Sequence, residues 1–157
     1  MGLEFSTPTR KRFEEVVALY PDKRAALLPA LSLAQKEFGC LNPEAMEYVA
    51  GLVGVTPAYV QGVVTFYTMF RQQPVGRYLI QVCTNLPCSL MGAEHVVEYL
   101  SGKLKIKEGE TTPDKKFTLI RVECLGACGG APMMQINDTF YENLTREKID
   151  LILAELK

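Results

Sequence analysis

Up to residue 71 the chain shows the hydrophobic pattern of amphipathic helices. Apolar side chains recur three or four positions apart, which places them on one face of a helix. The first predicted helix has its apolar positions between Phe13 and Tyr20, and the second extends from Asp22 to Phe38. Pro29 lies inside the second helix, where it removes a backbone hydrogen bond and should bend the segment.

Two further helices are predicted from their starting residues. Asn42-Pro43 places an N-cap before a proline at the first helical position, which predicts a helix to about Val53, and Thr56-Pro57 repeats this arrangement. The run from Tyr48 to Phe70 has no charged residue and is long enough to cross a bilayer. Because glycines and prolines interrupt it, we interpret the run as the buried core of a bundle of four short helices.

After the loop RQQPVG at residues 71–76, the pattern changes to strands alternating with helices. Residues 77–83 and 117–122 are predicted strands, residues 92–100 a helix, and the charged, turn-rich residues 103–116 a solvated loop. A tight hairpin is expected at Asn137-Asp138, between strands at 133–136 and 139–142. The last helix begins after Thr145, which is expected to cap it. The loop at 71–76 is the predicted domain boundary.

Composition limits the class of protein. The 157 residues are 48% hydrophobic and 22% charged, with a formal net charge of −1, as in an ordinary globular protein. This balance leaves no basic excess to attract nucleic acid. The N-terminal residues MGLEFSTPTRKR lack the apolar stretch of a secretory signal, so we expect a cytosolic chain with reduced thiols.

The cysteines are unevenly distributed. Cys40 stands alone, whereas Cys83 and Cys88 form one close pair and Cys124 and Cys128 another. A strand, a helix and a second strand in succession form a crossover unit, which predicts that the two strands are parallel. Because parallel strands end at the same edge of a sheet, the four paired cysteines are expected to converge there.

Four thiols with no nearby histidine or carboxylate indicate either zinc or an iron–sulfur cluster. Structural zinc usually binds cysteine pairs separated by two residues, whereas these pairs enclose four and three. The wider gaps favour a larger cluster, and Gly126, Gly129 and Gly130 would let backbone N–H groups approach its sulfur atoms. A structural zinc module with four cysteine ligands remains an alternative. A thiol oxidoreductase is a third, although the chain lacks the usual Cys-x-x-Cys spacing.

No other catalytic or nucleotide-binding motif is found. The sequence has neither a phosphate-binding loop nor a nucleophile paired with a base. A cluster without a substrate site indicates an electron carrier that exchanges electrons with a cofactor on another protein. Cys40, His95 and Met133-Met134 are interpreted as structural. The aromatic residues from Phe66 to Phe70 are interpreted as core, and any exposed one among them as a contact for a partner.

Four segments of the sequence carry a resemblance to a known family. They are ALLPALSLAQKEFG (residues 26–39), TFYTMFRQQPVGRY (65–78), QVCTNLPCSLMGAEH (81–95) and VECLGACGGAPMMQIND (122–138). In these segments the chain resembles the E subunits of bacterial respiratory NADH:quinone oxidoreductase, complex I. Gamma subunits of NAD-linked hydrogenases and formate dehydrogenases share the cysteine spacing and are the alternative.

This resemblance implies an α+β (α/β) fold in two domains. An N-terminal helical bundle, residues 1–75, would precede a thioredoxin-like [2Fe–2S] ferredoxin domain, residues 76–157. In the family the positions of Cys83, Cys88, Cys124 and Cys128 hold the cluster, with the first pair expected on one iron and the second pair on the other. Ala131-Pro132 matches the cis-proline position of thioredoxin folds.

The resemblance also implies an assembly. The chain would be a non-catalytic electron-transfer subunit of the NADH dehydrogenase, carrying one [2Fe–2S] cluster. FMN and NADH would be bound by a partner subunit that the helical bundle helps to hold, and other subunits of the peripheral arm would also be partners. The chain would lie on the cytoplasmic side of the inner membrane without inserting into it.

Overall fold

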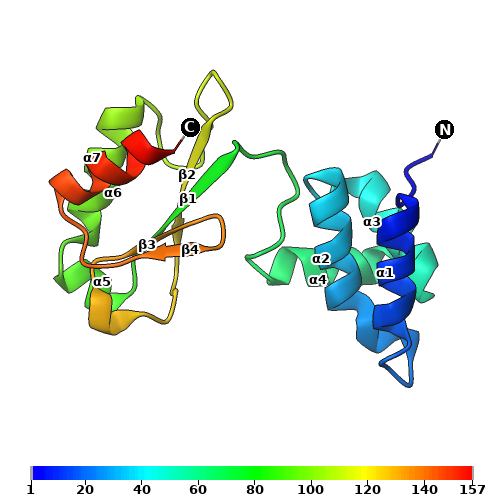
Figure 1. The fold of residues 1–157 in the computed structure, drawn as a ribbon. Helices are drawn as coiled ribbons and strands as arrows, with labels where there is room; N and C mark the ends of the chain where they lie inside the picture. Colours follow the sequence, from blue (N-terminus) through cyan, green and yellow to red (C-terminus); the bar gives the residue numbers. More distant parts are fainter. Residues whose placement is uncertain (1, 157) are drawn as a thin grey trace. The chain divides into compact units, whose positions relative to one another are not determined.

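The computed structural model describes residues 2–156 and divides into two compact units, one ending at Pro74 and the other beginning at Val75. The first unit is helical and the second contains a sheet (Figure 1). The helices of the first unit are α1 (Thr7–Val17), the short 3₁₀ helix η1 (Lys23–Ala26), α2 (Leu27–Phe38), α3 (Pro43–Val53) and α4 (Pro57–Phe66).

The prediction of one continuous helix from Asp22 to Phe38 is wrong. The Asp22 side chain accepts a hydrogen bond from the Arg24 N–H and starts η1, and α2 begins only at Leu27. Pro29 is therefore in the first turn of α2, where backbone N–H groups have no partner within the helix. A proline at this position removes no hydrogen bond of α2.

Polar side chains begin α3 and α4 as predicted. The Asn42 side chain accepts a hydrogen bond from the Ala45 N–H at 2.8 Å, and Thr56 accepts one from the Tyr59 N–H at 3.2 Å. Each cap satisfies a donor that the first turn of a helix would leave free. Helix α3 ends at Val53, also as predicted.

The helices of the first unit enclose an apolar core. Its fully buried side chains include Leu31, Leu41, Val49, Val60 and Val64. The expectation that α1 carries its apolar face as far as Tyr20 is wrong, because the helix ends at Val17. Leu19 beyond it is 80% exposed.

The aromatic residues between 66 and 70 are not all in the core as expected. Phe70 is buried, but Phe66 and Tyr67 are 75% and 38% exposed. Phe66 is the last residue of α4 and lies two positions after the buried Val64, so helical periodicity places it on the opposite face, and Tyr67 lies beyond the end of the helix. Among the described residues no single helix is long and apolar enough to span a bilayer. The pair α3 and α4, which meet at 115°, passes that test of length and composition only when taken together.

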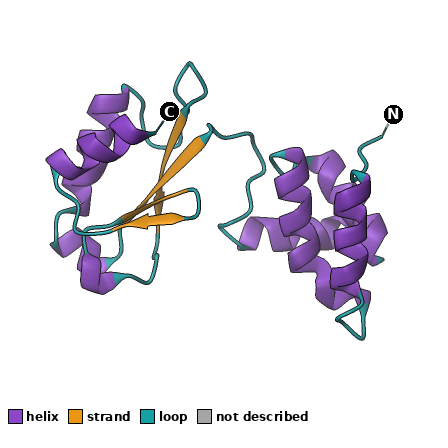
Figure 2. Ribbon diagram, viewed as in Figure 1, coloured by secondary structure: helices purple, strands orange, loops and turns teal. Residues whose placement is uncertain are grey.

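The second unit is built on a mixed sheet (Figure 2). The elements in chain order are β1 (Tyr78–Cys83), α5 (Leu86–Leu90), α6 (Ala93–Leu104), β2 (Phe117–Val122), η2 (Cys128–Gly130), β3 (Met134–Ile136), β4 (Thr139–Tyr141) and α7 (Arg146–Glu155). The strands lie in the order β2-β1-β3-β4; β1 and β2 are parallel, and the other two pairings are antiparallel. The predicted parallel pair and the predicted hairpin are both confirmed.

Helices α6 and α7 bury the sheet's main apolar surface. Helix α6 packs against β1 and β2, and the buried cluster of this unit joins Ile80 and Leu119 of those strands to Leu100 of α6 and Ile149 of α7. Thr145 caps α7 by accepting a hydrogen bond from the Lys148 N–H at 3.2 Å, as predicted. The sheet is thereby held as a rigid platform for the loops at its edge.

The segment at residues 103–116 is not wholly a solvated loop, which corrects the prediction. Helix α6 continues to Leu104, Ile106 and Thr112 are buried, and Thr111 forms an isolated bridge with Thr118 of β2. The backbone N–H of Gly76 also donates to the Thr118 hydroxyl, at 2.6 Å. These contacts fix the point at which the chain enters β1.

Gly76 lies so close to β2 that it cannot carry a side chain. A Cβ added to Gly76 would lie 2.8 Å from the backbone carbonyl carbon of Phe117, whereas one added to Gly102 in α6 would meet nothing within 4 Å.

We therefore expect Gly76→Ala to lower the melting temperature of the full chain. Gly102→Ala should raise the free energy of unfolding by about 0.5–1 kcal/mol, because alanine favours the helix. Equal melting temperatures for the two variants would contradict the close approach at Gly76.

Candidate metal centre

The carboxyl ends of β1 and β2 lie side by side. Cys83 is the last residue of β1 and pairs in register with Val122, the last residue of β2. The next residue extends the pairing, because the Thr84 N–H donates to the Val122 carbonyl oxygen at 3.0 Å. The loops that follow the two strands therefore start from neighbouring points, which is the arrangement predicted from the crossover unit.

Cys88 lies on the short helix α5, which the sequence pattern did not predict. The Asn85 side chain caps α5 by accepting from the Leu86 N–H at 2.8 Å, and Pro87 occupies the first turn. Ser89 donates from its hydroxyl to the Thr84 carbonyl oxygen at 2.9 Å, which folds the helix back onto the end of β1. An N-cap residue followed by an early proline was the available signal for this helix.

The second loop brings Cys124 and Cys128 to the same edge. Gly126 has a φ of +75°, a conformation that L side chains rarely adopt. This turn directs the Gly126 N–H to the sulfur of Cys124, at 3.3 Å. The predicted N–H approach to sulfur is thus present at Gly126. Cys128 begins η2, which leads into the cis peptide bond between Ala131 and Pro132, also as expected.

The four paired thiols are close enough for Cys88 and Cys124 to affect the ionisation of Cys83, and for Cys83 and Cys128 to affect that of Cys88. Burial acts to raise the pKa of Cys83, but the backbone N–H groups of Asn85 and Leu125, with the thiols of Cys88 and Cys124, bring that pKa below its ordinary value. Burial raises the pKa of Cys88 to about 11, and its bond to Cys83 adds to the shift. The site therefore stabilises a thiolate at Cys83, which is the form that binds metal.

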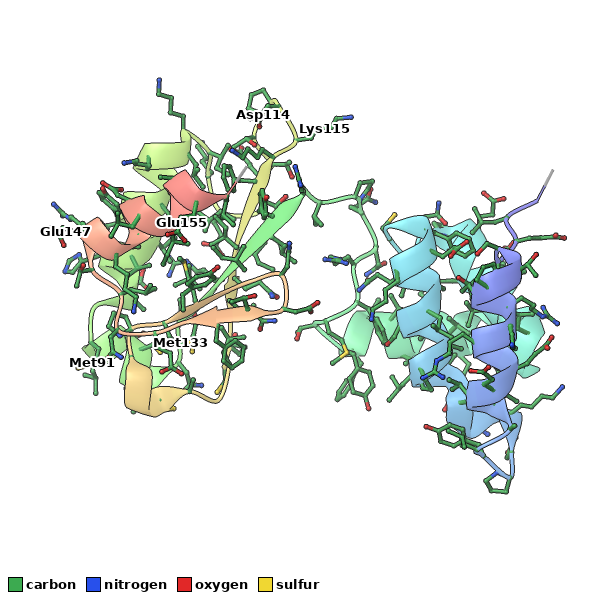
Figure 3. The ribbon with its side chains drawn as sticks, viewed as in Figure 1. Met91, Asp114, Lys115, Met133, Glu147 and Glu155 are labelled. Atoms are coloured by element: carbon green, nitrogen blue, oxygen red, sulfur yellow. The ribbon has the colours of Figure 1, made fainter. Side chains whose placement is uncertain are left out.

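The four thiols differ in exposure. Cys83 and Cys88 are 2% and 1% exposed, within a small apolar cluster that includes Ala93 and Met133. Cys124 and Cys128 are exposed. Ala93 is an unpredicted member of this cluster, because it belongs to α6, which begins beyond the first pair of cysteines. Met133 directly precedes β3 (Figure 3). One side of the candidate centre is thus dry and the other faces solvent.

The remaining candidates do not belong to this cluster. Cys40 is a buried residue of the first unit, as expected. His95 is on α6 with an exposed side chain, and its Nδ1 lies 3.7 Å from a carboxylate oxygen of Glu98. Met134 is fully buried, also as expected.

Within residues 2–156 no group of three or more His, Cys, Asp or Glu side chains has the arrangement to hold a metal ion, and all five cysteines are free.

The donor set nevertheless fits an iron–sulfur cluster in its chemistry. Thiolates are the usual protein ligands of such clusters, and the Gly126 N–H shows how the second loop can donate hydrogen bonds to sulfur. The apolar surroundings of the buried pair restrict water, and such surroundings help to set a cluster's reduction potential.

Comparison with known proteins identifies the family. The family model described as thioredoxin-like [2Fe-2S] ferredoxin matches residues 13–157. The chain belongs to this family. It is thus an iron–sulfur protein with the thioredoxin-like fold, which confirms the prediction from the sequence.

Several curated relatives are similar over most of this chain's length. An NADH-quinone oxidoreductase E subunit of Rhizobium meliloti (strain 1021) is 45% identical over 94% of this chain and 88% of its own. The corresponding E subunit of Rickettsia bellii (strain RML369-C) is 47% identical over 92% and 88%. The mitochondrial NADH dehydrogenase [ubiquinone] flavoprotein 2 of Dictyostelium discoideum is 43% identical over 98% of this chain and 64% of its own. The resemblance to E subunits is confirmed.

Among solved structures, the fold is similar to part of a hydrogenase. The air-oxidized NAD⁺-reducing [NiFe]-hydrogenase superposes with a TM-score of 0.73 over 83% of this chain and 22% of the hydrogenase chain. The sequence identity is 24%, so this likeness describes the fold alone.

Proposed function

We propose that this chain is the electron-transfer E subunit of a bacterial NADH–quinone oxidoreductase. The observation that carries the proposal is the meeting of two cysteine-bearing loops at the ends of paired parallel strands, in a chain up to 47% identical to such subunits. No complete active site is proposed for this chain. Its contribution to the oxidoreductase is to hold an electron between partners.

The ligands in this proposal are Cys83, Cys88, Cys124 and Cys128. Cys83 and Cys88 would bind one iron from the buried side, and Cys124 and Cys128 the other iron from the exposed side. A [2Fe–2S] cluster, when bound, accepts and returns one electron. The residues of this chain keep water from the buried thiols, through Met133 and its neighbours, and direct the Gly126 N–H toward Cys124.

The electron would come from a partner subunit that binds NADH and FMN. Residues 76–157 would carry the cluster and residues 1–75 would help to hold that partner. Exposed apolar side chains at the end of α4, among them Phe66 and Met69, support such a role because they leave apolar surface uncovered. In the assembly the chain would lie on the cytoplasmic side of the membrane, with other peripheral-arm subunits as neighbours and no inserted segment.

The second candidate function is that of a gamma subunit in an NAD-linked hydrogenase or formate dehydrogenase. The similar fold within an NAD⁺-reducing hydrogenase favours it. The longer and closer similarity to E subunits supports the first proposal more strongly. A structural zinc module is a further alternative, since four thiolates also suit that ion.

The ligand assignment predicts different effects for two cysteines. Cys124→Ser replaces a proposed ligand, so the visible absorption and the EPR spectrum of the reduced chain should change or disappear. Cys40→Ser is the matched control, because Cys40 is a buried cysteine of the first unit, and its spectra should equal those of the unmodified chain. Loss of the cluster from the Cys40 variant would contradict the assignment.

The proposed partner predicts how the chain becomes reduced. NADH alone should leave the full chain oxidised, whereas NADH with the purified flavin-binding partner should produce the EPR signal of the reduced cluster. A chain of residues 76–157 should keep the cluster but be reduced more slowly and fail to co-purify with the partner. Each unit has its own buried core, which is why the shorter chain is expected to fold. Equal binding by the two chains would contradict a role for residues 1–75.

A further inference from the structure

An acidic side chain lies against the turn that carries Cys128. Gly130, two residues after Cys128, is buried, and a Cβ added there would lie 2.5 Å from Oε2 of Glu142 and 2.6 Å from its Cδ. The Glu142 side chain therefore occupies the space that the glycine leaves free. Substitution of Gly130 is opposed by this packing even though its backbone conformation is not left-handed.

Backbone hydrogen bonds fix this approach. The N–H of Asn143 donates to the Gly130 carbonyl oxygen at 2.6 Å, and the N–H of Leu144 donates to the Pro132 carbonyl oxygen at 3.0 Å. The segment after β4 thus runs beside the segment after Cys128. Because Glu142 directly precedes the two residues that make these bonds, its backbone is held beside the cysteine turn.

The charge of Glu142 is not neutralised by an ion pair. No ion pair to this carboxylate occurs among the residues that the structure describes. The Lys148 ammonium lies near Glu142 but donates its hydrogen bond to the main-chain carbonyl oxygen of Glu142, at 2.5 Å, and not to the carboxylate. Its positive charge partly offsets the negative charge of the carboxylate, and both side chains are exposed to solvent.

The carboxylate is close enough to act on a centre at Cys128. Two consecutive Cα–Cα steps place the Cα atoms of Cys128 and Gly130 at most about 7.6 Å apart. The Glu142 Oε2 lies 2.5 Å from the position of a Gly130 Cβ, so the carboxylate is within about 12 Å of the Cys128 Cα. Screening by salt has a length of about 8 Å at physiological ionic strength, so salt weakens the interaction at this range without abolishing it. A negative charge at this range disfavours the addition of an electron to a thiolate-bound cluster, and net charge is one of the factors that set cluster potentials.

We propose that Glu142 lowers the reduction potential of the cluster through its negative charge, held against the Gly130 turn. It binds neither iron nor substrate, and it acts through space on the centre that Cys128 helps to hold. The inference rests on the proposed ligand set.

The test changes the charge at residue 142 and measures the midpoint potential of the cluster by EPR-monitored redox titration of the full chain. Glu142→Gln should shift the midpoint to a more positive value, and Glu142→Lys should shift it further in the same direction. High salt should reduce both shifts. The matched controls are Glu155→Gln and Glu155→Lys, at the other end of α7 from Glu147 (Figure 3). Glu155 lies about 14 Å along α7 from Arg146, the first residue of that helix, whereas Glu142 lies just before the helix begins. The same changes in charge at Glu155 should therefore shift the midpoint potential less.

Each other outcome overturns the proposal. Midpoints that do not follow the order Glu, Gln, Lys would exclude an electrostatic role, and equal shifts at Glu155 would show only an effect of total charge. Loss of iron and sulfide from the Glu142→Gln variant would show that Glu142 stabilises the turn at Gly130 and does not tune the potential of the cluster. If the ligand set itself is wrong, Cys124→Ser will keep the spectrum of the unmodified chain, so that failure is distinguished from a failure at Glu142.

Discussion

Parallel pairing of β1 with β2 is the constraint on which the candidate centre depends. The register that places Cys83 opposite Val122 brings together two loops whose cysteines are 36 or more positions apart in the sequence. Buried side chains such as Ile80 and Leu119 fix this register, because a slip of one residue would turn them to the opposite face of the sheet. The core of the second unit therefore positions the thiols although it contributes no ligand.

The two loops prepare different sides of the centre. The first loop places Cys83 and Cys88 among apolar side chains, where burial and neighbouring N–H groups control their ionisation. The second loop leaves Cys124 and Cys128 exposed and supplies an N–H to sulfur through the turn at Gly126. A dry side protects a cluster from water, and an exposed side lets a partner approach, so this asymmetry suits an electron carrier better than a closed structural site.

The sequence predicted those features that local patterns determine. Caps at Asn42 and Thr56, the two parallel strands and the hairpin after Met133 all follow from residue types and spacing, and the structure contains them. Helix α5 was missed because five residues are too short to show helical periodicity. The place of Glu142 beside Gly130 could not be predicted either, since it depends on how the segment after β4 packs. The exposure of Phe66, which lies on the face of α4 opposite the buried Val64, is likewise not indicated by its hydrophobicity alone.

The most direct test of the account is to count metal and sulfide in the purified full chain and record its EPR spectrum after reduction. Convergence of the four thiols around the cluster that gives the family its name predicts two irons and two acid-labile sulfides per chain, with a signal that appears on reduction. One zinc per chain, with no sulfide and no signal, would contradict it.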